Sequence, residues 1–233
     1  MKKRILTSIA LLVVFSAISI SSFAQQGRFK GTVKYELEWE GDYPPGVPTE
    51  MEIKVYDNKS SFTNILSMGE PVITNSDANL IYSMYDFSTI PVDGVTGKWY
   101  YRNKVENEEL EKNTYTFLDE TKEIAGMTAK KVEVKYEDKD GKEVEEIIWA
   151  SDEIGPKIDL LFYTGLKAMP FQFDLDAGDF KITFTVKEIT KGKVKSAEML
   201  IPTGYDEVSV EELQDIFETL MEALGGGGGD DDF

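Results

Sequence analysis

Residues 29–39 alternate between apolar and polar side chains, and this period of two constrains the fold more than any other feature of the sequence. The odd positions carry the apolar side chains, namely Phe29, Val33, Tyr35, Leu37 and Trp39. Successive side chains of an extended strand point to opposite faces, so this strand buries one face and exposes the other. Strands with one wet face are typical of antiparallel sheets.

The same alternation recurs along most of the chain. Strands are predicted over residues 51–55, 60–64, 80–85, 98–102 and 115–118. Two hairpins are also predicted, one pairing residues 132–136 with 144–149 and one pairing 180–186 with 194–201. Consecutive hairpins of this spacing indicate an antiparallel meander, closed as a barrel or open as a strongly curved half-barrel sheet.

One helix is predicted at the end of this mainly β (α+β) fold. Ser209 and Glu212 form a capping box, in which each side chain accepts a hydrogen bond from the other residue's backbone amide. Apolar residues then recur at helical spacing up to Leu224, which indicates an amphipathic helix over residues 209–224 packed on the sheet. Residues 225–229 are all glycine, and we expect 225–233 to form a flexible Gly/Asp tail behind a single domain of residues 25–224.

The first 24 residues have the pattern of a signal peptide. Lys2, Lys3 and Arg4 precede an apolar stretch over residues 5–20, and cleavage is predicted between Ala24 and Gln25. The apolar stretch is too short and too often interrupted for a membrane span. We therefore expect a soluble periplasmic or extracellular protein with no membrane span in the mature chain.

The charge of the mature chain argues against polyanionic partners. The full sequence has 25 basic and 43 acidic residues, and removing the three basic residues of the leader leaves 22, for a net charge of about −21. A chain this acidic repels phosphate backbones and anionic membrane surfaces, so nucleic-acid binding is excluded. The charge favours solubility, and a cationic partner is the alternative.

The mature chain contains neither cysteine nor histidine, which removes whole classes of chemistry. Triads with a histidine base and zinc sites of Cys or His ligands are excluded, and we predict no metal, no cofactor and no catalytic residue. Without cysteine, an N-terminal lipid anchor is excluded as well. A carboxylate pair remains as an enzymatic alternative. Residues 174–179 resemble a calcium loop only faintly and are interpreted as a turn.

Aromatic side chains remain as candidates for contacts with a ligand. A curved sheet that does not close must cover its concave face with a helix, with loops or with an apolar ligand. The candidate lining residues are Tyr35, Trp39, Phe180 and Phe184, with core packing as the alternative for each.

Three short motifs resemble a family of uncharacterised secreted Bacteroidota proteins. They lie at residues 124–131 (IAGMTAKK), 149–154 (WASDEI) and 201–205 (IPTGY). The resemblance spans residues 29–205 and implies a fold similar to the lipoprotein-localisation half-barrels, in which a curved sheet often encloses an apolar cavity. Many members have a cysteine where Ala129 stands and are lipoproteins, which this cysteine-free chain cannot be. No catalytic residue follows from the resemblance.

These observations lead to a non-enzymatic binding protein for a hydrophobic ligand or a lipidated chain. The alternatives are a module that docks an envelope protein through its acidic surface or tail, and a hydrolase with a carboxylate pair. The size of the cavity inside the curved sheet distinguishes the ligand carrier from the docking module. A dry apolar cavity of roughly 300 Å³ or more favours a carrier, whereas a filled interior favours a partner-binding role.

Overall fold

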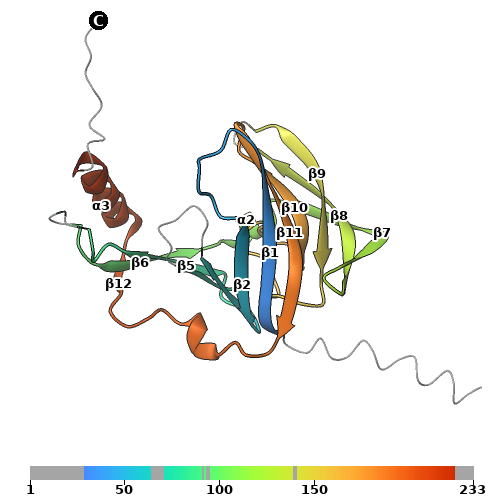
Figure 1. Cartoon of the computed structure of the whole chain (residues 1–233), viewed down its shortest axis with the longest axis horizontal. Helices are drawn as coiled ribbons and strands as arrows, with labels where there is room; N and C mark the ends of the chain where they lie inside the picture. Colours follow the sequence, from blue (N-terminus) through green and yellow to red (C-terminus); the bar gives the residue numbers. More distant parts are fainter. Residues whose placement is uncertain (1–28, 64–70, 91, 93–94, 139–140, 224–233) are drawn as a thin grey trace, which may run out of the picture.

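A computed structural model describes residues 29–63, 71–90, 92, 95–138 and 141–223. Within them a single 12-stranded sheet runs in the order β12-β6-β5-β4-β3-β2-β1-β11-β10-β9-β8-β7. The sheet is open and strongly curved, with β5, β6 and β12 extending away from the curved part (Figure 1). The predicted fold class, a mainly β protein with a curved antiparallel sheet, is confirmed. The leader, the cleavage site and residues 224–233 lie outside the described residues.

The elements have the following bounds. The strands are β1 (Lys30–Gly41), β2 (Glu50–Tyr56), β3 (Lys59–Thr63), β4 (Pro71–Asn75), β5 (Leu80–Asp86), β6 (Lys98–Lys104), β7 (Thr114–Ile124), β8 (Met127–Glu137), β9 (Glu143–Ser151), β10 (Met169–Asp176), β11 (Phe180–Lys191) and β12 (Asp206–Val208). The helices are α2 (Asn107–Leu110), the 3₁₀ helix η1 (Ser196–Met199) and α3 (Val210–Ala223). All neighbouring strands are antiparallel except β12 and β6, which are parallel.

The first strand forms the centre of the sheet. β1 pairs with β2 on one side and with β11 on the other. Its odd-numbered side chains Val33, Tyr35 and Leu37 are buried. They form the main core with the inward residues of β2, β8, β10 and β11. The period of two therefore predicted both the strand and its buried face.

One of the two predicted hairpins is correct and the other is wrong. β8 and β9 pair as expected. Residues 194–201 do not return as a strand beside β11, because both edges of β11 are already occupied by β1 and β10. They form η1 instead, where the Glu198 carboxylate accepts a hydrogen bond from the Lys195 amide and pairs with Lys54 at 2.8 Å.

The predicted C-terminal helix is confirmed as α3. Its capping box is formed, since the Ser209 amide donates to Glu212 at 2.8 Å and the Glu212 amide donates to the Ser209 hydroxyl at 3.1 Å. α3 packs on the β5–β6 end of the sheet through Leu220 and Phe217, over Phe87. This small second core is separate from the main core, so α3 does not cover the curved part of the sheet.

An irregular segment, residues 152–168, lies against the main core instead. This segment, called the plug loop below, contributes Ile154, Tyr163, Leu166 and Ala168 to the main core. It also contacts the segment that contains α2, since Gly165 lies directly against the Leu110 carbonyl. The plug loop rather than α3 therefore packs against the curved part of the sheet.

Candidate binding cleft

A buried carboxylate holds the plug loop in shape. The Asp159 oxygens accept hydrogen bonds from the backbone amides of Leu161, Phe162 and Tyr163 at 3.0, 3.2 and 2.8 Å. Burial raises the pKa of Asp159, while these amides, with that of Leu160, oppose the shift by stabilising the charged form. These hydrogen bonds therefore fix the backbone that carries Leu161, Phe162 and Tyr163 on the side of the loop that faces the sheet.

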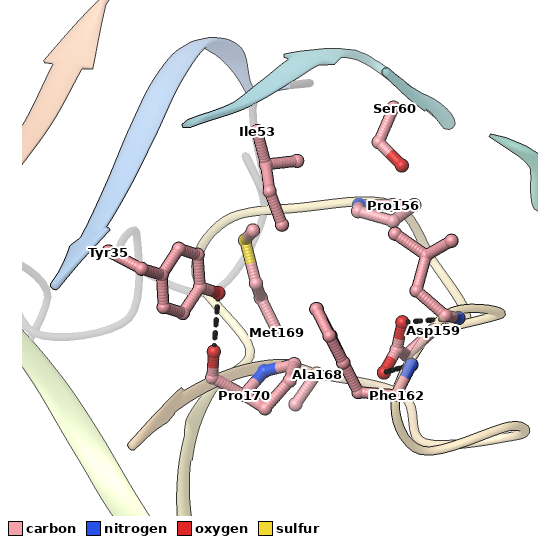
Figure 2. A pocket seen from close by; sticks show the side chains of 10 residues that line it. Tyr35, Ile53, Ser60, Pro156, Asp159, Phe162, Ala168, Met169 and Pro170 are labelled. Carbon is pink, nitrogen blue, oxygen red and sulfur yellow. Dashed lines mark hydrogen bonds between the residues drawn. The ribbon is translucent and has the colours of Figure 1, made fainter. Parts of the chain in front are cut away.

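The space between the plug loop and the centre of the sheet is almost completely filled. The Tyr35 hydroxyl donates a hydrogen bond to the Pro170 carbonyl at 2.7 Å, and Met169 and Phe162 lie beside it (Figure 2). The cavity that remains there has a volume of about 10 Å³. This is room for about one water molecule and far below the size of a ligand. The interior expected to hold a ligand is packed.

The four candidate lining residues lie in two groups. Tyr35 and Phe184 are both about 1% exposed and belong to the main core, with their ring centroids 6.5 Å apart. Trp39 lies near the end of β1 and Phe180 at the start of β11, with their ring centroids 5.4 Å apart, and the Trp39 indole donates to the Pro48 carbonyl. Of the four, only Tyr35 lines the small cavity. Their role in binding stays a prediction.

A larger opening arises where β9 and β10 separate. β10 pairs with β9 only through Met169, Pro170 and Gln172, which face residues 149–151. A register shift between Pro170 and Gln172 leaves an extra residue on β10, and such a bulge bends its strand. No further β9–β10 pair forms among the described residues, so the strands diverge toward residues 143–147 and 173–176.

The divergence creates a cleft of about 610 Å³, called the β9–β10 cleft below. Its apolar wall is formed by Tyr136 of β8, Phe162 and Tyr163 of the plug loop, and Phe173 and Leu175 of β10. Asp174 and Asp176 also line it, although alternate residues of β10 point to opposite faces of the sheet. The cleft therefore opens along the edge of β10 and reaches both faces.

The aromatic wall of the cleft is continuous with the main core. Phe173 stacks on Phe184 with centroids 4.7 Å apart and rings 4° from parallel. Phe162 lies 4.8 Å from Phe173, and Tyr163 meets the same ring edge-on at 5.4 Å. Phe173 is buried, whereas Leu175 is 43% exposed at the mouth of the cleft. The aromatic wall of the cleft is therefore packed directly against the main core.

Carboxylates give the cleft a negative potential. Burial raises the pKa of Glu146, a shift opposed by its hydrogen bond with the Tyr163 hydroxyl and reinforced by Asp174. Partial burial also acts on Asp174, but the hydrogen bonds from Lys181 and Thr183 outweigh it and lower the pKa of Asp174. Lys181 lies 2.8 Å from Asp174. The lining thus holds three carboxylates against one ammonium group, and it favours cations.

A second groove, of about 510 Å³, lies at the other end of the plug loop. Its lining is dominated by charged side chains, including Glu153, Lys157 and Lys167. Across the described residues, no group of three or more acidic side chains is arranged to hold a metal ion. The turn predicted over residues 174–179 is confined to residues 177–179, where the Gly178 amide donates to Asp176 at 2.8 Å, whereas residues 174–176 belong to β10.

No pattern in the sequence pointed to the main residues of the cleft, which are Glu146, Tyr163, Phe173 and Leu175. One signal for the plug loop was available. Asp159 is a single charge within the apolar run of residues 158–163, which is unusual unless the carboxylate is buried and satisfied by hydrogen bonds. The separation of β9 from β10 has no comparable signature in the sequence.

The comparisons with known proteins relate the chain to others by structure alone. No family model matches the chain, and no curated protein matches it significantly. PNGF-II in its C2 crystal form superposes with a TM-score of 0.53 at 13% identity, over 82% of this chain and 33% of PNGF-II. This chain thus spans about a third of PNGF-II, and at such low identity the likeness concerns the fold only.

Two further solved structures were found. The P21 crystal form of PNGF-II gives a TM-score of 0.47 at 13% identity, over 82% of this chain and 34% of that one. The Mycobacterium tuberculosis lipoprotein LppX gives a TM-score of 0.29 at 16% identity, over 79% of this chain and 97% of LppX. Membership of the secreted Bacteroidota family stays a prediction. In the described part of the chain, no helix is long and apolar enough to cross a membrane.

Proposed function

We propose that this chain is a non-enzymatic binding protein that takes up a hydrophobic ligand, or the apolar part of a chain, in the β9–β10 cleft. The observation that carries this proposal is the cleft itself, at about 610 Å³ with an aromatic wall. Ligand sites typically have volumes of about 300–1,000 Å³ and combine apolar walls with a few polar groups. The filled interior argues against a carrier that encloses its ligand. The ligand is therefore placed in the open cleft between β9 and β10.

The packing around the cleft also supports the proposal. Phe173 is fixed by its stack on Phe184, and Tyr163 is fixed by the plug loop and by its hydrogen bond to Glu146. A preformed apolar surface loses little conformational entropy when a ligand binds. Export to the periplasm or the outside of the cell is part of the same proposal and rests on the predicted leader of residues 1–24.

The carboxylate-pair alternative also has an observation in its favour. Glu146, with a raised pKa, and Asp174, with a lowered pKa, line the same cleft. Two carboxyl groups whose environments push their pKa values apart are the arrangement that acid and base roles require. Glycoside hydrolysis by the wild type that is lost in both Glu146→Gln and Asp174→Asn would favour this alternative. Absence of such activity in the wild type would count against it and in favour of the binding proposal.

A neutral apolar dye, N-phenyl-1-naphthylamine, tests the proposal by its fluorescence on binding. Leu175→Asp places a charge at the mouth of the cleft, where the side chain is already 43% exposed, so the fold should tolerate it. The matched control is Leu200→Asp, since Leu200 is 59% exposed and lies outside the cleft. We expect Leu175→Asp to bind the dye about tenfold more weakly than the wild type. Leu200→Asp should bind the dye as tightly as the wild type. Equal binding by both variants and the wild type would contradict the proposal.

A further inference from the structure

We infer that the occupant of the β9–β10 cleft is an extended polypeptide segment with alternating basic and apolar side chains, which adds to the sheet as a strand between β9 and β10. This inference rests on the proposed function, since it names the ligand class of the same cleft. Strand addition obtains affinity from backbone hydrogen bonds and specificity from alternate side chains.

The backbone of β10 offers hydrogen-bonding groups to the cleft. The Ala177 amide donates to the Phe180 carbonyl at 2.9 Å, which makes this pair hydrogen-bonded in the β10–β11 hairpin. Hydrogen-bonded and non-hydrogen-bonded pairs alternate along an antiparallel ladder. Leu175 and Phe173 therefore bond to β11, whereas the amide and carbonyl groups of Asp174 and Asp176 point away from β11 and into the cleft.

The facing edge of β9 has the complementary arrangement. The Asp138 amide donates to the Lys142 carbonyl at 3.0 Å at the β8–β9 turn. By the same alternation, the backbone groups of Glu145 and Ile147 point away from β8 and toward β10. If the pairing of Gln172 with Trp149 continued, Asp174 would face Ile147 and Asp176 would face Glu145. Neither pair forms, so β9 and β10 are not paired with each other beside the cleft, which Glu146 of β9 and Asp174 and Asp176 of β10 line.

Charge indicates which partner would join the two edges. Direct pairing would set Asp176 opposite Glu145, and like charges directly opposite one another destabilise a sheet. A strand inserted between them would instead place its own side chains beside both carboxylates on the outer face. Lysine or arginine at those positions converts the repulsion into attraction.

The inner face of the cleft requires the opposite kind of side chain. Leu175 and Phe173 point inward on β10, and Tyr136 and Tyr163 complete an apolar surface on that side. Residues of the inserted strand that point inward are therefore apolar, and those between them are basic. All extended strands rise about 3.3 Å per residue, so the four residues 173–176 can pair with about four residues of the partner.

The chain's own C-terminal tail does not match this requirement. Residues 230–232 are all aspartate, and three further carboxylates would be repelled by those of the cleft. A basic segment of another protein is the occupant that satisfies both the charge and the backbone pattern.

Residue-resolved amide hydrogen exchange tests the inference on the mature protein, with a hexapeptide of alternating lysine and valine as the probe. In the unbound protein we expect the amides of Asp174 and Asp176 to exchange at least tenfold faster than those of Phe173 and Leu175. Saturating peptide should slow exchange at Asp174 and Asp176 at least tenfold, leaving Phe173 and Leu175 unchanged. The same peptide with N-methylated valines should bind at least tenfold more weakly.

The charge pattern is tested with Asp176→Lys and its matched control Asp179→Lys, since both side chains are exposed on the same hairpin. We expect about tenfold weaker peptide binding for the first variant and little change for the second. Peptide binding without new protection at Asp174 and Asp176, or equal binding of the N-methylated peptide, would overturn strand addition. If the neutral dye binds the cleft but the peptide does not, this inference fails while the proposed function stands; if neither binds, both fail.

Discussion

The Tyr35 hydroxyl donates a 2.7 Å hydrogen bond to the Pro170 carbonyl, which joins the central strand to the start of β10 across 135 positions of sequence. The bond is buried, and the burial of the Tyr35 side chain raises its pKa well above the usual value. It fixes β10 at the point just before its separation from β9. The bond therefore links the filled centre of the sheet to the open cleft.

Removal of this hydroxyl in Tyr35→Phe should lower the free energy of unfolding by about 1–3 kcal/mol, because the buried Pro170 carbonyl loses its partner. Urea unfolding measures the change. Tyr43→Phe is the control, since the Tyr43 side chain is 43% exposed and should be insensitive to the substitution. Equal stability of Tyr35→Phe and the wild type would show that the bond does not contribute.

Asp159→Ala should release the plug loop, because three backbone amides lose their shared acceptor at once. We expect a loss of about 2–4 kcal/mol in the free energy of unfolding, together with faster amide exchange at Leu161 and Tyr163. Glu153→Ala, an exposed carboxylate of the same loop, should change neither quantity. Unaltered exchange at these amides in Asp159→Ala would contradict the anchoring role.

Gly165→Ala should destabilise the chain for two reasons. Gly165 has a φ of +93°, and a Cβ atom there would overlap the Leu110 carbonyl, whose backbone must then move. Gly126→Ala isolates the first reason, since Gly126 has a φ of +77° with open space around it. We expect a loss of about 1 kcal/mol for the control and at least about 2 kcal/mol for Gly165→Ala. Equal losses by thermal unfolding would mean that the Leu110 contact is easily relaxed.

Glu146→Gln should stabilise the chain at neutral pH. Burial raises the pKa of Glu146 in the folded state, so its ionised form is disfavoured there relative to the unfolded chain. The resulting cost is absent below the unfolded pKa, where both states are protonated, and develops as the pH rises to the folded pKa. We expect a gain below about 1 kcal/mol at pH 7, since solvent screens a half-buried group, and no gain near pH 3. A gain at pH 3 of the same size would refute the electrostatic explanation.

The same site gives a direct titration. In Tyr163→Phe the Glu146 carboxylate loses the hydrogen bond that stabilises its charged form, so its pKa should rise further. A carboxyl-carbon NMR titration of the wild type and the variant measures both values. A pKa that stays the same or falls in Tyr163→Phe would show that the hydroxyl does not support the carboxylate.

The parts of the fold that depend on local pattern could be predicted from the sequence. The alternation around Tyr35 predicted β1 and its buried face, and the capping box at Ser209 predicted the start of α3. β10 was missed because its first half is buried on both faces and contains Pro170, so neither alternation nor composition marks it as a strand. The hairpin into 194–201 was wrong because β1, from the far end of the chain, occupies the edge that the hairpin required.

The cleft depends on information that no local pattern contains. It exists because β9 and β10, which the 17 residues of the plug loop connect, pair only at the end of β9 and the start of β10. The pairing ends after a register shift between Pro170 and Gln172, and its continuation would place Asp176 opposite Glu145. The sequence predicted aromatic lining on a concave face, and the structure places the ligand-sized space at a gap in the sheet.

A map of nuclear Overhauser contacts between N-phenyl-1-naphthylamine and the mature protein tests the central claim most directly. A ligand in the β9–β10 cleft should show contacts to the methyl groups of Leu175 and Leu161 and to the ring of Tyr136, and none to Leu220 under α3. Contacts confined to the α3 core, or a dye that binds without contacting Leu175, would contradict the assignment of the cleft as the binding site.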